Sequence, residues 1–216
     1  MQTVDTVPDA IRYFSKNSRE FMEAVRWPDG NERCLRCGAA QVRDLKKQGL
    51  WKCYRQHRSP TFTLRTGTVF EDSRVPLDKW LTATWLIIIC KNRFSSYEIG
   101  RRIGVTQKTA SSMQHRIRLA MQANGLPVTE LGGEFENGET MPQSSPLTKE
   151  QFESRPEFER FKTIVRDGLT ISKSELDYMV RQAKRNSPRL GNPNAPGRKA
   201  RVHGRMSSIL YLPFYG

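Results

Sequence analysis

The chain has 216 residues, with 36 Lys and Arg against 22 Asp and Glu and a formal net charge of +14 at pH 7. An excess of this size favours a polyanionic partner. Only 37% of the residues are hydrophobic, so we expect small cores and some extended chain, which argues against an enzyme built on one large core. No leader segment is recognisable, and no apolar run approaches the about 20 residues that a membrane span requires. We therefore expect a cytoplasmic protein without a membrane partner.

Residues 1–26 predict an amphipathic helix, because apolar side chains recur from Ile11 to Val25 at helical spacing. We expect its apolar face to cover either the cysteine-rich segment that follows or the helices farther along the chain. Its role is predicted to be structural.

Residues 27–72 carry the spacing of a zinc ribbon. Cys34 and Cys37 form a C-x-x-C pair, and Cys53 is followed at the fourth position by His57. Three thiolates and one imidazole make a standard structural zinc set. The sequence therefore predicts a structural zinc ion bound by these four residues.

Other interpretations of this segment stay open. A C-x-x-C pair can be a redox pair, although such a motif opens a helix in a βαβ unit and turn-forming residues surround this one. His57 could be a solvated loop residue beside Arg55 and Arg58. Cys90 is a competing fourth ligand, but it lies in an apolar run where a free thiol behaves as a small apolar side chain.

The ribbon is expected to be β-structured. Alternating and β-branched residues predict strands at 41–45 and 49–53 around a turn, with further strands at 61–64 and 68–70. After the ribbon, residues 77–91 are apolar nearly all round, which is typical of a buried central helix.

Within a helical domain at 73–125, the sequence predicts a helix-turn-helix. Ser95 and Glu98 form a capping box that opens a helix to about Ile103. Gly104 ends this helix, and Thr106 is a natural N-cap for a second helix to about Met121.

The second of these helices is predicted to contact double-stranded DNA. Short polar side chains near its N-terminus suit base edges in the major groove, and the flanking arginines suit phosphates. Between Lys91 and Arg118 there are seven Lys and Arg against one acidic residue, although an ordinary solvated face is the alternative. The predicted contact residues are Arg101, Arg102, Thr106, Gln107, Lys108, Thr109, Ser111, Ser112, His115, Arg116 and Arg118. A protein of this kind would be nucleoid-associated when it is bound to DNA.

The C-terminal third is expected to be less compact. Residues 126–147 form a linker, and residues 148–186 form a pair of short helices that open with capping boxes at Thr148 and Ser172. Two short helices should dock on the helical domain or on a partner. Residues 187–216 are predicted to be a basic flexible tail, which either contacts phosphates or serves only solubility.

Several motifs occur in a fixed order along the chain: Trp27-Pro28-Asp29-Gly30, Cys34-x-x-Cys37-Gly38, Thr66-Gly67-Thr68-Val69-Phe70-Glu71-Asp72-Ser73, Pro76-Leu77, Trp80, Ser95-Ser96-Tyr97, Gln107-Lys108-Thr109-Ala110 and His115-Arg116-Ile117-Arg118-Leu119-Ala120-Met121. In this order they resemble the N-terminal half of zinc-ribbon DDE transposases of bacterial insertion sequences, over about residues 8–140. The resemblance implies that the ribbon and the helix-turn-helix recognise transposon ends. It also implies that an RNase H-like domain with metal-bound carboxylates would follow.

The chain departs from that family at the catalytic position. Gly138 stands where the first catalytic aspartate is expected, and His57 stands where the last zinc ligand is usually a cysteine. Two-metal cleavage needs several carboxylates on a supporting scaffold. Glu134, Glu136 and Glu139 lie in one short segment without one. The sequence therefore predicts no catalytic residue.

Together these patterns predict an α+β fold: a small zinc-ribbon β domain, a mainly α helix-turn-helix domain and a partly disordered helical C-terminal region. The predicted function is transposase-like DNA binding without catalysis. The alternatives are an active transposase with a diverged catalytic site and a zinc-ribbon transcriptional regulator. An RNA-binding ribbon that stacks bases on Trp51, Tyr54 and Phe62 is a further alternative. The oligomeric state and the DNA site are not predicted.

Overall fold

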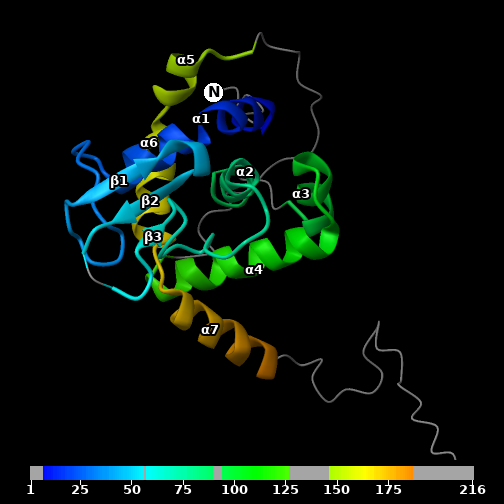
Figure 1. Cartoon of the computed structure of the whole chain (residues 1–216). Coiled ribbons are helices and arrows are strands. Elements are labelled where there is room, and N and C mark those ends of the chain that lie inside the picture. Colours follow the sequence, from blue (N-terminus) through cyan, green and yellow to red (C-terminus); the bar gives the residue numbers. More distant parts are fainter. Residues whose placement is uncertain (1–6, 56, 90–93, 127–145, 187–216) are drawn as a thin grey trace, which may run out of the picture. The chain divides into compact units, whose positions relative to one another are not determined.

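The structure is a computed structural model that describes residues 7–55, 57–89, 94–126 and 146–186 (Figure 1). It is α+β, as predicted. The helices are α1 (Val7–Arg26), α2 (Leu77–Ile88), α3 (Ser96–Ile103), α4 (Gln107–Ala123), α5 (Lys149–Glu153), α6 (Pro156–Thr163) and α7 (Lys173–Arg185). The strands are β1 (Val42–Leu45), β2 (Leu50–Cys53) and β3 (Thr61–Phe62). The chain divides into two units between Val180 and Arg181, and the packing below concerns the first.

The strands form one antiparallel sheet in the order β1-β2-β3. A 3-10 turn over Lys46–Gln48 joins β1 to β2, and Gly49 closes it with a positive φ of 65°, which only glycine adopts at little cost. The first two strands match the predicted ones to within a residue at each end, and the third is shorter. Residues 68–70 are not a strand; instead Thr68 pairs with Thr170 in an isolated bridge.

Helix α1 contacts both of its predicted neighbours. Its apolar face is buried against α2, with Phe14 fully enclosed. It also contacts the ribbon: the Arg19 guanidinium donates to Asp44 at 2.9 Å and lies 4.7 Å from the centre of the Trp51 ring. The helix therefore connects the sheet to the helical bundle.

Helix α2 is the buried centre of the bundle, as its apolar sequence predicts. Trp80, Leu81, Trp85 and Leu86 are at most 1% exposed. The helix ends at Ile88, earlier than the predicted residue 91; residues 90–93 lie outside the described part of the chain.

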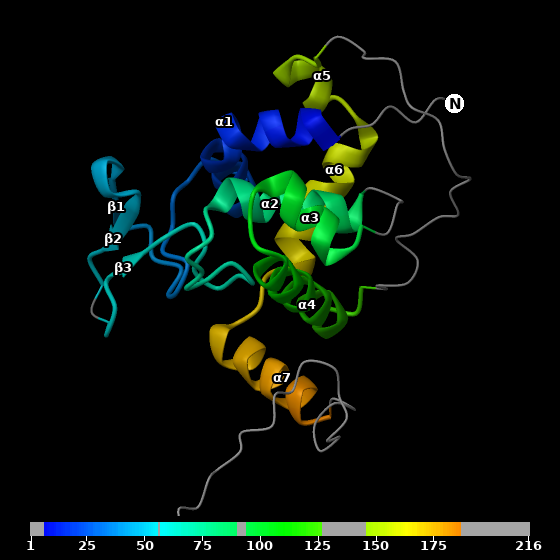
Figure 2. The same ribbon diagram turned by 90° about the vertical axis from the view of Figure 1, so that its right-hand side faces the viewer.

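The segment after the linker docks on α1 and α2 through an aromatic cluster. Tyr13 stacks on Phe152 with ring centres 4.8 Å apart, and Phe161 lies 5.1 Å from Trp85 and 5.5 Å from Phe21. Both ribbon views place α5 and α6 beside α1 (Figures 1 and 2). The buried side chains from Val7 to Leu176 consequently form one connected core.

The first predicted C-terminal helix is divided in two. The capping box of Thr148 and Gln151 opens α5, as predicted, but the helix stops before Pro156, which begins α6. Proline has no N–H for the preceding turn and favours the first helical position. Helix α6 runs on into a π-helical turn, η2 (Ile164–Gly168).

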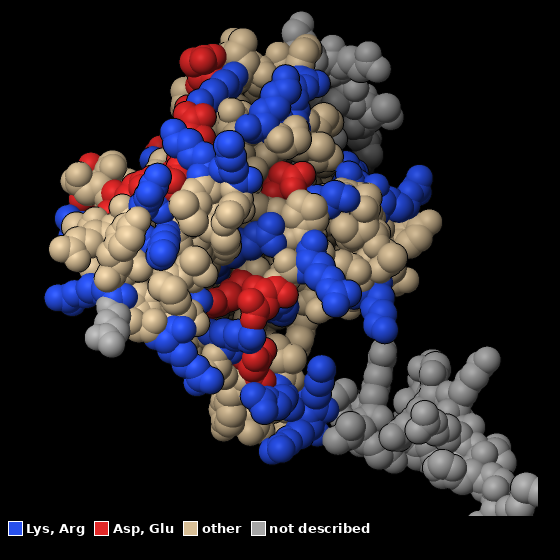
Figure 3. Space-filling model, in the orientation of Figure 1, with Lys and Arg blue, Asp and Glu red and all other residues tan. Residues whose placement is uncertain are grey.

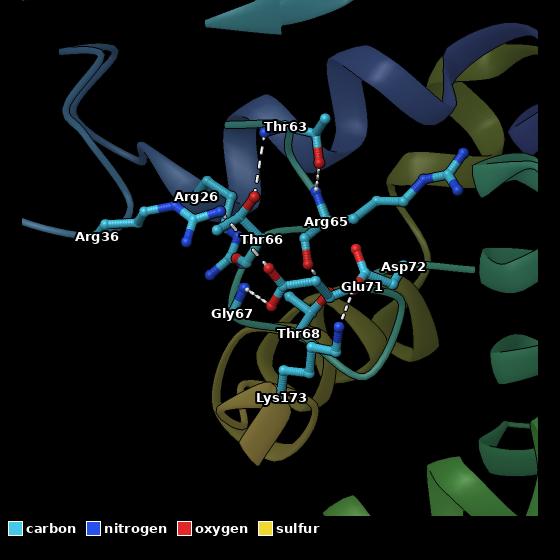
Figure 4. Close-up of polar contacts among 10 residues, drawn as sticks. All are labelled: Arg26, Arg36, Thr63, Arg65, Thr66, Gly67, Thr68, Glu71, Asp72 and Lys173. Carbon is cyan, nitrogen blue, oxygen red and sulfur yellow. Dashed lines mark hydrogen bonds and ion pairs between the residues drawn. The ribbon is translucent and has the colours of Figure 1, made fainter. Parts of the chain in front are cut away.

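Residues 63–75, here called the junction loop, connect the ribbon to α2. They form hydrogen bonds with one another, with α1 and with the C-terminal segment (Figure 4). Arg65 donates from Nη1 to the carbonyl oxygens of Ser73 and Val75, at 2.9 and 3.1 Å. The Glu71 carboxylate accepts from the Gly67 N–H at 2.9 Å. The loop is thus closed on itself by a guanidinium at one end and a carboxylate in the middle.

Other elements bind the same loop. Arg26 of α1 donates to the carbonyl oxygens of Leu64 and Thr66. From the C-terminal segment, the Ile171 N–H donates to the Gly67 carbonyl oxygen, and Lys173 pairs with Asp72. The junction loop therefore joins α1, the ribbon and the C-terminal segment.

Some predicted features lie outside the described residues. These are Cys90, the acidic segment from Glu134 to Glu139 with Gly138, most of the linker, and the tail at 187–216. The six-part domain division stays a prediction. Among the described helices, none combines the length and the apolar character that crossing a membrane would need.

We predict that Phe161→Ala destabilises the protein by about 3–5 kcal/mol, because it removes a ring that is fully buried among three aromatic side chains. Urea unfolding followed by far-UV circular dichroism measures the change. Tyr178→Ala on α7 is the matched control, because this ring is 60% exposed and surface substitutions change stability by only about 0.5 kcal/mol. Equal stability of the two variants would contradict the docking of α6.

Candidate metal centre and nucleic-acid surface

The loop after α1 presents Cys34 and Cys37 from one tight turn. The Gly38 N–H donates to the Cys34 carbonyl oxygen at 2.8 Å, and the Cys34 N–H donates to the Ala39 carbonyl oxygen at 2.9 Å. Gly38 has a φ of 72°, which is favourable only for glycine. The Trp27 Nε1–H donates to the Arg33 carbonyl oxygen at 3.1 Å. These bonds hold the two sulfur atoms on the same side of the turn.

The second pair comes from the end of β2 and the turn after it. Cys53 is the last residue of β2, and its N–H donates to the Pro60 carbonyl oxygen at 2.7 Å. This bond closes the turn that carries His57. The ligand atoms of Cys34, Cys37, Cys53 and His57 all lie within 4.8 Å of one another.

The spacing fits a tetrahedral zinc site. The Cys37 and Cys53 sulfurs are 3.7 Å apart, and the Cys34 sulfur is 3.8 Å from Nε2 of His57. With Zn–S distances of about 2.3 Å, the edge of a tetrahedron is about 3.8 Å long. A disulfide would need about 2.05 Å, and the three cysteines are free. The cluster is consistent with a structural zinc ion that has four protein ligands and no open position for chemistry.

The surroundings of the cluster shift the pKa values of two of its thiols in opposite directions. Cys34 and Cys53 are 3% and 1% exposed, whereas Cys37 lies at the surface. The backbone N–H of Ala39 lowers the pKa of the Cys37 thiol, and burial raises the pKa of Cys53. Since zinc binds the deprotonated sulfur, metal binding would release protons from these thiols.

A family model gives an independent description of this region. Residues 16–58 match the transposase zinc-ribbon domain. The match begins within α1 and ends one residue after His57, so it includes all four predicted zinc ligands. No curated protein and no solved structure matched the chain. The transposase zinc-ribbon match therefore agrees with the resemblance over the ribbon and supports transposase-related nucleic-acid binding.

Beyond the matched region, α3 and α4 are joined by three residues. Ser95 and Glu98 form the predicted capping box, with bonds of 2.8 and 3.2 Å between each side chain and the other residue's N–H. Gly104 caps the C-terminus of α3 with a φ of 66°. A Cβ atom on Gly100 would lie 2.9 Å from the Val105 carbonyl oxygen. Glycine at both positions therefore permits the tight turn.

Helix α4 has one buried and one exposed face. Ala110, Met113, Ile117, Ala120 and Met121 are at most 2% exposed. Nine of the predicted DNA-contact residues are exposed to solvent: Arg101, Arg102, Thr106, Gln107, Lys108, Ser111, Ser112, His115 and Arg118. The structure therefore brings most of the predicted residues to the surface on or beside one helix.

Three of the predicted residues are engaged within the fold. The Thr106 hydroxyl accepts the Thr109 N–H at 3.2 Å, and the two threonine hydroxyls lie 2.9 Å apart. Arg116 is partly buried: it donates to the Glu71 carbonyl oxygen at 3.1 Å and lies 5.5 Å from the centre of the Trp80 ring. Burial lowers the pKa of Arg116. Arg116 thus connects α4 to the junction loop.

Sequence reasoning missed the residues that position the α3–α4 turn. Lys79 of α2 donates to the Gly104 carbonyl oxygen at 2.9 Å, and Gln114 of α4 donates to the Phe94 carbonyl oxygen at 3.0 Å. Both are side-chain bonds to distant backbone, which no local pattern predicts. It also missed the exposed cations Arg43 and Lys52 of the ribbon strands. Figure 3 shows Lys and Arg spread over one face of the molecule, with acidic side chains near its middle and along its upper left.

We predict that the purified chain binds one zinc ion and that Cys37→Ser lowers its zinc content and its stability, because the variant loses one of four ligands. Elemental analysis and thermal unfolding with and without a chelator measure these effects. Cys90→Ser is the control and should keep full zinc content. Loss of zinc from Cys90→Ser, with retention in His57→Ala, would instead make Cys90 the fourth ligand.

Proposed function

We propose that the protein binds double-stranded DNA in a sequence-selective way, with α3 and α4 acting as a helix-turn-helix and the zinc ion stabilising the ribbon. The exposed polar face of α4 carries this proposal. Gln107, Lys108, Ser111 and Ser112 lie exposed in its first turns, while its other face is fixed in the core. Amide and hydroxyl groups on an anchored helix suit base edges in the major groove.

The charges around α4 support the same proposal. Arg101 and Arg102 lie on α3 and Arg118 lies on α4, all of them exposed. Among the described residues, no acidic side chain forms an ion pair with any of the three. Arg102 lies 4.8 Å from the centre of the Phe94 ring. The Ser95 N–H lowers the pKa of Glu98 most, and the charge of Arg102 helps to lower it. Exposed cations without an ion pair are available to phosphates, which position a protein on the duplex without reading its sequence.

The attachment of α4 to the rest of the fold also supports the proposal that this helix reads DNA. Arg116 bonds to the junction loop and Gln114 to the chain before α3. A reading helix must be held rigidly, because base contacts depend on side-chain placement to within a fraction of an ångström. Arg116 is therefore assigned to positioning α4, and Arg101, Arg102 and Arg118 to phosphate contacts.

We propose binding without strand cleavage, as expected from Gly138 in the sequence. Selection of bound duplexes from a random DNA pool, repeated over a range of salt concentrations, tests the binding. Enrichment of one sequence is expected, whereas a steep salt slope without enrichment would contradict sequence-selective readout.

The selected duplex then tests the alternatives. Incubation with Mg²⁺ or Mn²⁺ should leave it intact. Nicked or joined products that disappear in Glu136→Gln or Glu139→Gln would favour an active transposase with a diverged catalytic site. A selected sequence that occurs in promoters, and not at the ends of mobile elements, would favour a transcriptional regulator.

We predict that Gln107→Ala with Lys108→Ala reduces the preference for the selected duplex over a scrambled one by about 10- to 100-fold, because a good base contact contributes about 1–3 kcal/mol of discrimination. Fluorescence anisotropy with labelled duplexes measures both affinities. The control is Gln122→Ala, an exposed polar residue at the other end of α4, which should keep the preference. Loss of preference in the control alone would place the reading surface elsewhere.

A further inference from the structure

The outward face of the ribbon sheet carries a row of polar side chains. Arg43 of β1 is the direct cross-strand partner of Lys52 of β2, which in turn pairs with Thr61 of β3. All three are exposed, whereas Trp51 and Cys53 on either side of Lys52 are buried. Because successive side chains of a strand point to opposite faces, Arg43, Lys52 and Thr61 share one face, here called the outer sheet face.

This arrangement costs stability in the isolated protein. Like charges directly opposite each other in an antiparallel pair are destabilising. The one acidic residue between Val42 and His57 is Asp44, which bonds Arg19 on the other side of the sheet and has a side chain only 14% exposed. Among the described residues, no carboxylate forms an ion pair with Arg43 or Lys52. Within the described fold, no acidic partner therefore compensates either cation.

More cations surround the pair. Exposed basic residues occupy the turn between β1 and β2 and the turn after β2: Lys46, Lys47, Arg55 and Arg58. Tyr54 is 57% exposed, and the Lys52 ammonium lies 5.7 Å from the centre of its ring. The outer sheet face and its two turns thus form a basic surface on the ribbon that is separate in sequence from α3 and α4.

The chemistry of this face suits a phosphate backbone more than unpaired bases. A platform for single strands needs exposed aromatic faces on which bases stack. Trp51 and Phe62 are 1% and 2% exposed, and Lys52 lies near the ring of Tyr54. Tyr54 is the one exposed aromatic ring described on this surface, and most of the other exposed side chains there are long and cationic.

We propose that the outer sheet face is a second contact surface for duplex DNA, which binds phosphates and does not read the sequence. This inference rests on the proposed function and extends it to the ribbon. Arg43 and Lys52 would each neutralise a phosphate, so the like-charge pair that destabilises the free sheet would be stabilised in the complex. A zinc ion bound by Cys53, the neighbour of Lys52, would hold the end of β2 and this cation in place.

The test uses the full-length zinc-loaded chain with Arg43→Gln and Lys52→Gln combined. Affinities for the selected duplex and for a scrambled duplex of the same length are measured by anisotropy over a series of salt concentrations. The slope of log K against log salt should become shallower by about 1.8, or about 0.9 for each lost phosphate contact. Both affinities should fall by the same factor, so that the preference between the duplexes is unchanged.

A charge-matched control separates local contacts from net charge. Lys16→Gln with Arg160→Gln removes two exposed cations from α1 and α6 and should leave the slope nearly unchanged. The ribbon variant should also keep its zinc and unfold at the same or a higher urea concentration, because a like-charge pair has been removed. An equal slope change in both double variants, or no change in the ribbon variant, would overturn the inference.

The outcomes also separate this inference from the proposed function. If the ribbon variant lowers the slope while Gln107→Ala with Lys108→Ala leaves the preference intact, the outer sheet face stands and the role of α4 is wrong. If the preference falls with the α4 variant and the slope is unchanged in the ribbon variant, the reverse holds. A single-stranded RNA of the same length that binds more tightly than the duplex, through Arg43 and Lys52, would overturn the assignment to duplex DNA.

Discussion

The fold depends on guanidinium groups that bind the carbonyl oxygens of the junction loop. Arg26, Arg65 and Arg116 come from α1, the loop itself and α4, and each donates to backbone oxygens within residues 63–75. A loop without a regular hydrogen-bond ladder leaves its carbonyls without partners, and a buried carbonyl without a donor is costly. Burial lowers the pKa of Arg26 to about 10, so this side chain still carries its charge at neutral pH. The nearby Glu71 carboxylate favours that charged form.

The two candidate nucleic-acid surfaces are both connected to this loop. Arg116 bonds it from α4, and Arg36 of the ribbon lies 3.8 Å from the Glu71 carboxylate. The C-terminal segment adds a backbone bond of 3.0 Å from the Val69 N–H to the Leu169 carbonyl oxygen. Because the ribbon, the helices and the C-terminal segment share one loop and one core, both proposed surfaces would belong to one folded unit when they meet a duplex. Preorganisation of this kind lowers the entropic cost of binding.

Local patterns in the sequence were sufficient to predict three features of the structure. These are the capping boxes at Ser95 and Thr148, the buried helix α2, and the metal cluster that brings Cys34 and His57 together. Each rests on residues close in the chain or on ligand chemistry. The docking of Phe152 and Phe161 against Tyr13 and Trp85 joins segments more than 60 residues apart. It could not be predicted, because an apolar helix face in the sequence does not indicate which other segment it packs against. For the same reason Thr68 reads as a strand residue locally, although its bridge is formed with Thr170. The sequence predicts that Arg116 lies on a helix, but it does not predict that the side chain binds the Glu71 carbonyl oxygen. A basic residue on a helix can bind a phosphate or a carbonyl oxygen equally well.

The net charge of +14 points to a polyanion, but only the environment of each cation shows where one could bind. Arg26, Arg65 and Arg116 are partly buried and already bond carbonyl oxygens, so they add to the total while part of their donor capacity is used within the fold. Arg19 and Lys149 are paired with Asp44 and Glu20, at 2.9 and 2.7 Å. By contrast, Arg43 faces Lys52 across the sheet. A folded sheet that keeps two cations opposed, while its one nearby acid pairs elsewhere, gives up stability in its free state. That cost supports the proposed surface for negative charge more specifically than the composition does, because it concerns two named residues.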